Sequence, residues 1–182
     1  YDYSRAGNPT RNALEETIAS LEDGTDAAMF GSGMAAMSAI FTLLKQGDHL
    51  ILSGNVYGGT YRLLTQIMEN MGLSASWIDT SDSKLVRATI TSDTKMIVIE
   101  SPTNPMMQLT DIQAVSKISK EHNLLVVVDN TFMSPYYQRP ISLGADLVMH
   151  STTKCINGHS DVIGGVVIGS DSEIMDRLHF IQ

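Results

Sequence analysis

Seven short apolar runs alternate with helix-like segments along this chain, and this rhythm restricts the fold more than any other feature. Several runs are rich in Val and Ile without alternating polar residues, which is typical of strands covered on both faces. Strands that alternate with helices predict one α/β domain with a mainly parallel seven-stranded sheet and helices on both faces. The predicted strands are Ala27–Phe30, His49–Ser53, Ala75–Ile78, Met96–Ile99, Leu124–Val128, Leu147–His150 and Val166–Ile168.

Proline, glycine and capping residues mark the ends of the helices between these strands. One segment begins at Pro9, two others stop at Gly47 and Gly72, and Thr110 precedes a fourth as a candidate N-cap. The predicted helices are Pro9–Glu22, Ser32–Gln46, Tyr61–Met71, Asp111–His122 and Ser172–Gln182.

Charge, hydropathy and cysteine content narrow the range of functions. The net charge is −8 and the basic residues are scattered singly, which argues against a nucleic-acid partner. The longest apolar runs have strand length, so no membrane span is expected. Cys155 is the only cysteine, so an intrachain disulfide is impossible and a reducing compartment, the cytoplasm, is expected.

A small-residue turn, Gly31-Ser32-Gly33-Met34-Ala35-Ala36, joins the first strand to the next helix. Glycines allow close approach of a ligand, and the helix N-terminus offers free N–H groups, so the turn fits an anion such as phosphate. A tight packing turn is the alternative. The pattern also matches the dinucleotide fingerprint, but the second strand ends Ser53-Gly54-Asn55, without the required acid.

Asp129 follows the apolar run Leu124–Val128, at the carboxyl end of a predicted central strand. Open α/β sheets bind ligands at this edge. A carboxylate there is costly unless it meets a cation or several donors, and the pyridinium N–H of pyridoxal 5′-phosphate (PLP) is such a cation. A helix-cap or loop aspartate is the alternative interpretation.

Lys154 follows the next strand in the segment Ser151-Thr152-Thr153-Lys154. A lysine in an apolar, partly desolvated site is a usable nucleophile toward an aldehyde, and Ser151 and Thr153 could donate to a phosphate. A surface lysine in a loop is the alternative. His159 and Asp161 lack a third metal ligand at suitable spacing, so we expect no metal site.

Six ordered motifs along the whole chain resemble the Cys/Met-metabolism PLP enzymes. They are Tyr3-Ser4-Arg5-x-Gly7-Asn8-Pro9-Thr10, Ser32-Gly33-Met34-Ala35-Ala36, Val56-Tyr57-Gly58-Gly59-Thr60, Glu100-Ser101-Pro102-Thr103-Asn104-Pro105, Val128-Asp129-Asn130-Thr131 and Ser151-x-Thr153-Lys154. The resemblance implies the large PLP-binding domain of type I PLP-dependent transferases over residues 1–182. It also implies an N-terminal segment and a C-terminal domain beyond them, so we expect this chain to be a fragment.

The resemblance assigns a role to each motif. Lys154 would carry the cofactor and move protons, and Tyr57 would stack on the ring and act toward the leaving group. The other predicted cofactor contacts are Asp129 at the pyridine nitrogen, Gly33, Met34, Ser151 and Thr153 at the phosphate, Asn104 near the ring hydroxyl and Thr131 near the ring. Tyr3 and Arg5 would reach the cofactor of a neighbouring copy in a homo-oligomer, typically a dimer of dimers.

Within the family, the segments Asn157–Asp161 and Phe132–Tyr136 are most similar to cystathionine γ-lyases. We therefore expect γ-elimination of a sulfur amino acid, cystathionine, to cysteine, 2-oxobutyrate and ammonia. Cystathionine γ-synthase and methionine γ-lyase activities are alternatives, although methionine γ-lyases usually carry Cys where this chain has Gly59. A non-catalytic cofactor-binding or oligomerisation module is a third. Cys155 departs from the family, which usually has Tyr there.

Overall fold

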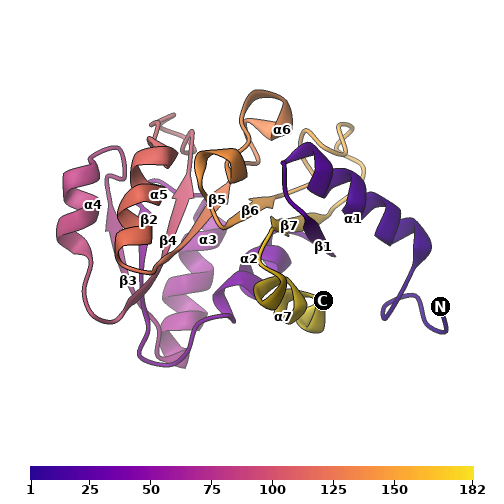
Figure 1. Ribbon diagram of the computed structural model, residues 1–182, viewed down its shortest axis with the longest axis horizontal. Helices are drawn as coiled ribbons and strands as arrows, with labels where there is room; N and C mark the ends of the chain where they lie inside the picture. Colours follow the sequence, from indigo (N-terminus) through magenta and orange to yellow (C-terminus); the bar gives the residue numbers. More distant parts are fainter.

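A seven-stranded sheet forms the centre of the computed structural model, which describes residues 1–182 (Figure 1). The strand order is β1-β7-β6-β5-β4-β2-β3; β7 is antiparallel to both of its neighbours, and all other pairs are parallel. The strands are β1 (Asp26–Phe30), β2 (His49–Ser53), β3 (Ser74–Ile78), β4 (Thr94–Glu100), β5 (Leu125–Asp129), β6 (Leu147–His150) and β7 (Gly165–Gly169). The predicted mainly parallel sheet is confirmed.

Helices cover both faces of the sheet, and Figure 1 shows α1 and α7 on opposite sides of β1 and β7. Along β5, Val127 packs into one apolar cluster, whereas Val126 and Val128 pack into another on the opposite face. Burial on both faces explains why the strands read as continuous apolar runs. Residues of α2 (Gly33–Phe41), α3 (Gly58–Leu63) and α7 (Ser172–Ile181) join the first cluster, those of α4 (Ser83–Thr89) and α5 (Ile112–Glu121) join the second, and those of α1 (Pro9–Leu21) join a third.

Two of the five predicted helices differ clearly from the observed ones. The helix predicted to run to Gln46 ends at Phe41, because a turn in which the Asp48 carboxylate accepts the Lys45 amide at 2.8 Å replaces its last residues. The helix predicted from Tyr61 begins three residues earlier as α3. It continues as a π-helical segment, Leu64–Met68, and a short 3₁₀ turn, Glu69–Met71.

The predicted N-cap Thr110 is wrong. The side chain of Asp111 caps α5 by accepting the Ala114 amide at 2.9 Å, while the Thr110 hydroxyl is hydrogen-bonded to Thr80 at 2.6 Å. Three further elements were not predicted: α4, the short helix α6 (Ser134–Tyr137) and a 3₁₀ turn at Ile141–Leu143.

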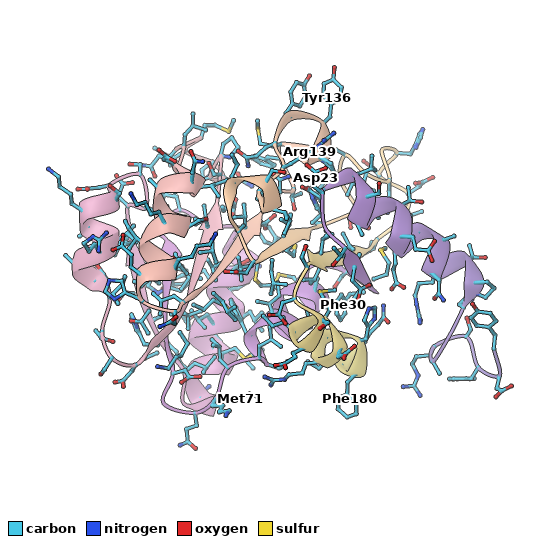
Figure 2. All side chains as sticks on the ribbon, viewed as in Figure 1. Asp23, Phe30, Met71, Tyr136, Arg139 and Phe180 are labelled. Carbon is cyan, nitrogen blue, oxygen red and sulfur yellow. The ribbon has the colours of Figure 1, made fainter.

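A surface ion pair ties the segment after α1 to the segment after α6. Figure 2 shows Arg139 and Asp23 close together, and the Arg139 guanidinium lies 3.4 Å from the Asp23 carboxylate. The same figure shows Tyr136 projecting away from α6. No helix is both long and apolar enough to cross a membrane.

Candidate active site

A cavity of ≈ 470 Å³ lies where the carboxyl ends of β4, β5 and β6 meet the start of α2. This volume falls in the range of about 300–1,000 Å³ typical of small-molecule sites. The cavity is lined by nine of the eleven predicted site residues, namely Gly33, Met34, Tyr57, Asn104, Asp129, Thr131, Ser151, Thr153 and Lys154. It is also lined by six that were not predicted: Ser32, Thr60, Glu100, Phe132, Met149 and Ile163.

The start of α2 forms one end of the cavity. Ser32 caps the helix by accepting the Ala35 amide at 3.0 Å. The amides of Gly33 and Met34 have no intrahelical partners, because no helical carbonyl precedes them by four residues. A side chain at Gly33 would have no room, because its Cβ would lie 2.8 Å from the Cβ of Ser151. The close approach places free N–H groups beside the Ser151 hydroxyl, an arrangement suited to an anion.

Asp129 is the last residue of β5 and faces the cavity. Its Oδ1 accepts the Thr131 amide at 3.1 Å and the Thr131 hydroxyl at 2.6 Å, whereas Oδ2 accepts no hydrogen bond within the chain. Burial raises the pKa of Asp129, and the Thr131 hydrogen bonds oppose this change. The free carboxylate oxygen is therefore suited to a cationic N–H donor.

The segment after β6 supplies hydroxyl groups. The Ser151 amide donates to the Thr131 hydroxyl at 2.9 Å, and the Ser151 hydroxyl has no partner. The Thr153 hydroxyl already contacts the backbone of Gly164, accepting its amide at 3.1 Å and donating to its carbonyl at 3.3 Å. The Thr153 hydroxyl proton is therefore already used within the chain, so Thr153 is less able to donate to a phosphate than we expected.

Lys154 lies in the cavity wall, in a run of turns that follows β6. The residue is exposed, and its side chain makes no ion pair within the chain. The expectation of a partly desolvated lysine is not met within this chain, because Lys154 lies on a turn where its residue is exposed. Cys155, beside it, is a free and exposed thiol.

Tyr57 and Asn104 flank the cavity on segments that follow β2 and β4. The Tyr57 ring is 48% exposed and lies against Gly59, where a Cβ would stand 2.4 Å from the ring. The Asn104 side chain is half-buried and has no hydrogen-bond partner. Both side chains are thus free to contact a ligand.

Tyr3 and Arg5 do not line this cavity. Both are exposed in the segment before α1, and the Arg5 guanidinium lies 5.5 Å from the centre of the Tyr3 ring. Their predicted role toward a neighbouring copy stays a prediction.

Glu100 is the main residue that the sequence analysis missed. It ends β4, is 7% exposed and lines the cavity. Burial, followed by the charge of Asp129, raises the pKa of Glu100 to about 7. The signal was present, because Glu100 follows the predicted strand Met96–Ile99 directly, as Asp129 follows its own.

A buried polar network connects the end of α1 to the ends of β5 and β6. The imidazole of His150 is hydrogen-bonded to the Glu22 carboxylate, and both side chains are at most 1% exposed. The Asn130 side chain donates to Glu22 and to the Gln138 carbonyl, each at 2.8 Å. This network anchors the residue that directly follows Asp129.

The candidate metal ligands do not converge. No group of three or more His, Cys, Asp or Glu side chains in the chain is placed to hold a metal ion. His159 instead contacts the Asn157 carbonyl at 3.0 Å within a local turn.

The donor set of the cavity fits PLP. The free amides of α2 and the Ser151 hydroxyl suit a phosphate, the free oxygen of Asp129 suits a pyridinium N–H, and Lys154 supplies an amine for an aldehyde. Each of these protein groups lacks a partner within the chain. A ligand that carries a phosphate, a pyridinium N–H and an aldehyde would satisfy all of them together.

Comparisons with known proteins agree with this assignment. The sequence model of the Cys/Met metabolism PLP-dependent enzyme family matches residues 1–182. All of the chain aligns with 57% of a Herpetosiphon aurantiacus protein named "Probable cystathionine gamma-synthase" at 50% identity, and with 47% of "Cystathionine beta-lyase MetC" of Bacillus subtilis (strain 168) at 48% identity.

A solved structure shares the fold closely. The crystal structure of cystathionine γ-lyase from Lactobacillus plantarum complexed with L-serine superposes with a TM-score of 0.98 at 45% identity, over 100% of this chain and 48% of that one. The chain thus spans about half the length of the relatives it matches. By sequence and by fold, the chain belongs to the Cys/Met metabolism PLP-dependent enzyme family.

Proposed function

We propose that the protein is a PLP-dependent carbon–sulfur lyase of transsulfuration, which cleaves cystathionine by γ-elimination to cysteine, 2-oxobutyrate and ammonia. One observation carries the proposal. The unpartnered oxygen of Asp129 and the unpartnered amine of Lys154 line the same cavity, next to the free amides of α2.

When bound, PLP supplies an aldehyde for amines and a protonated ring that accepts electrons from the substrate α-carbon. Oδ2 of Asp129 would accept the ring N–H and keep that nitrogen protonated. The amides of Gly33 and Met34 and the Ser151 hydroxyl would hold the phosphate. The exposed ring of Tyr57 would cover the cofactor ring, with Asn104 beside it.

Two side chains would move protons during the reaction. The amine of Lys154 would act as the acid–base group that moves the protons of the substrate α-carbon and β-carbon. The exposed Lys154 side chain has no ion-pair partner within the chain, which leaves its amine available for this role. The Tyr57 hydroxyl would donate a proton to the departing thiolate.

The relatives named above have three different reaction names at 45–50% identity, so overall identity does not choose among them. The resemblance of Asn157–Asp161 and Phe132–Tyr136 to γ-lyases favours γ-elimination. Gly59 disfavours methionine γ-lyase, because methionine γ-lyases usually carry Cys at this position. Cystathionine γ-synthase is the nearest alternative, and a non-catalytic cofactor-binding module is the alternative of another class.

The test is a product assay on the full-length holoenzyme. Cystathionine alone should yield cysteine and 2-oxobutyrate, whereas an activated homoserine plus cysteine should yield little cystathionine. Lys154→Ala should abolish turnover, and Lys84→Ala, on the exposed surface of α4, should not. Efficient synthesis of cystathionine without its cleavage would contradict the lyase assignment and support cystathionine γ-synthase instead.

We also propose a homo-oligomer in the cytoplasm. The exposed position of Tyr3 and Arg5 outside the chain's own cavity supports a role in a neighbouring copy, where Arg5 would bind the cofactor phosphate. Arg5→Ala should therefore weaken PLP binding in the assembled protein, as equilibrium dialysis would measure.

A further inference from the structure

Glu100 touches the two segments that carry Tyr57 and Asn104. Its Oε2 accepts the Tyr57 amide at 2.6 Å, and its Oε1 accepts the Asn104 amide at 3.1 Å. The two amides belong to different segments of the cavity lining, one after β2 and one after β4. No Lys, Arg or His side chain forms an ion pair with Glu100, so these amides are its principal partners.

We propose that Glu100 is a positioning residue of the active site, whose carboxylate bridges the amides of Tyr57 and Asn104 and thereby fixes both side chains at the cavity. The assignment rests on the proposed function, in which Tyr57 and Asn104 contact PLP.

The local structure leaves this task to Glu100. Tyr57 occupies the N-cap of α3, where its own amide has no acceptor within the helix, and the carboxylate of Glu100 accepts this donor. The Glu100 backbone is itself fixed, because its amide donates to the Ser53 hydroxyl at 3.3 Å, and Ser53 is hydrogen-bonded to Thr80 at 2.8 Å. The carboxylate therefore projects from a rigid strand end.

The chemistry of the bridge requires a carboxylate. Each oxygen accepts one N–H, and hydrogen bonds to an ionised acceptor are stronger than neutral ones. A glutamine has one acceptor oxygen, so its NH₂ group would face one of the two amides donor to donor. Burial and the charge of Asp129 raise the pKa of Glu100 to about 7, so ionisation of Glu100 carries a free-energy cost in this site. The two amides lower that cost.

Asp146 offers a matched control. It is half-buried, burial raises its pKa, and its Oδ2 accepts the Val126 amide at 2.7 Å. It lies just before β6 and contacts the start of β5, at the edge of the sheet opposite the cavity. Asp146→Asn should thus disturb a buried carboxylate–amide bond without touching the site.

The test is amide hydrogen exchange, resolved to single residues, in the full-length protein with and without PLP. Glu100→Gln should speed exchange at Tyr57 or Asn104 on the order of 10-fold or more, as expected for loss of a charge-assisted hydrogen bond. Asp146→Asn should speed exchange at Val126 only. Glu100→Gln should also lower kcat/KM roughly 10-fold or more through misplacement of Tyr57, and change the circular dichroism of bound PLP.

Glu100→Asp is a second variant in case Glu100→Gln does not fold. It keeps the negative charge, but its side chain is one methylene too short to bridge both amides. Exchange at Tyr57 and Asn104 within two-fold of the wild type in either folded variant would overturn the proposal. A wild type that binds PLP but does not cleave cystathionine would refute the proposed reaction instead, while the exchange result would still decide the role of Glu100.

Discussion

Glu100 and Asp129 end neighbouring parallel strands, are paired in register and line one cavity. Burial raises the pKa of each, and the charge of Asp129 raises that of Glu100 further. Desolvation and mutual repulsion of these two neighbouring carboxylates favour protonation of at least one of them. The cofactor-free protein should therefore hold an additional proton here that a cationic ligand would release.

This pair predicts a pH dependence of stability without PLP. The pKa of Glu100 is about 7 in the folded state and 4.5 ordinarily, so the folded state binds more protons between these values. The stabilisation of the folded state that protonated Glu100 contributes is fully present below pH 4.5 and is lost as pH rises through about 7. The loss is on the order of 3 kcal/mol, and Asp129 adds to it with the same sign.

Urea unfolding of the cofactor-free protein at several pH values measures this effect. The other titratable groups that line the cavity, Asp129, Tyr57 and Lys154, are the same in Glu100→Gln. That variant should show a distinctly flatter decline between pH 4.5 and 7. Parallel profiles for the two proteins would contradict the account of Glu100.

Gly59 sets the position of the Tyr57 ring. A Cβ at Gly59 would stand 2.4 Å from the ring and 2.7 Å from the Met34 sulfur, so Gly59→Ala must displace the ring. Alanine favours the helix by about 1 kcal/mol, so stability should not fall greatly. We expect kcat/KM to fall roughly 10- to 100-fold.

Steady-state kinetics of Gly59→Ala, measured with Gly58→Ala as a control, test this prediction. A Cβ at Gly58 meets only the end of the flexible Arg62 side chain, at 3.4 Å, so this neighbour should behave like the wild type. Equal activity of the two variants would mean that the ring position is not critical.

At the scale of elements, a buried pair links α1 to β6. Glu22 follows α1 directly, His150 ends β6, and neither reaches solvent. Removing one partner leaves the other buried without its hydrogen-bond partner, so His150→Ala should lower the free energy of unfolding by about 3–5 kcal/mol. His122→Ala, at an exposed position after α5, should change it by less than about 0.5 kcal/mol.

Chemical denaturation followed by circular dichroism measures both variants. A loss below about 1 kcal/mol for His150→Ala would show that the pair is neutral in energy and that the packing of α1 alone holds this end of the sheet.

At the scale of the whole molecule, the strands were predictable because they are buried on both faces, so their composition alone identifies them. The site was predictable because polar residues such as Asp129 and Lys154 follow such strands, and the carboxyl ends of parallel strands share an edge. All seven strands and nine cavity residues agree with these expectations. The assignment of particular roles came from the family resemblance.

What could not be predicted depends on partners distant in sequence. The Glu22–His150 contact spans 128 positions, and the Glu100–Tyr57 bond spans 43, so no local pattern marks them. The helix α6 is only four residues long, too short to show a helical period. The openness around Lys154 likewise depends on the path of the turn after β6 rather than on residue types.

The central claim is that Lys154 carries PLP in the cavity at the ends of β4, β5 and β6. Borohydride reduction of the full-length holoenzyme, followed by peptide mapping with mass spectrometry, tests it most directly. The account predicts loss of the visible absorption and a covalent pyridoxyl label on Lys154, absent in Lys154→Arg. A label on another lysine, or no label in a folded sample saturated with PLP, would contradict it.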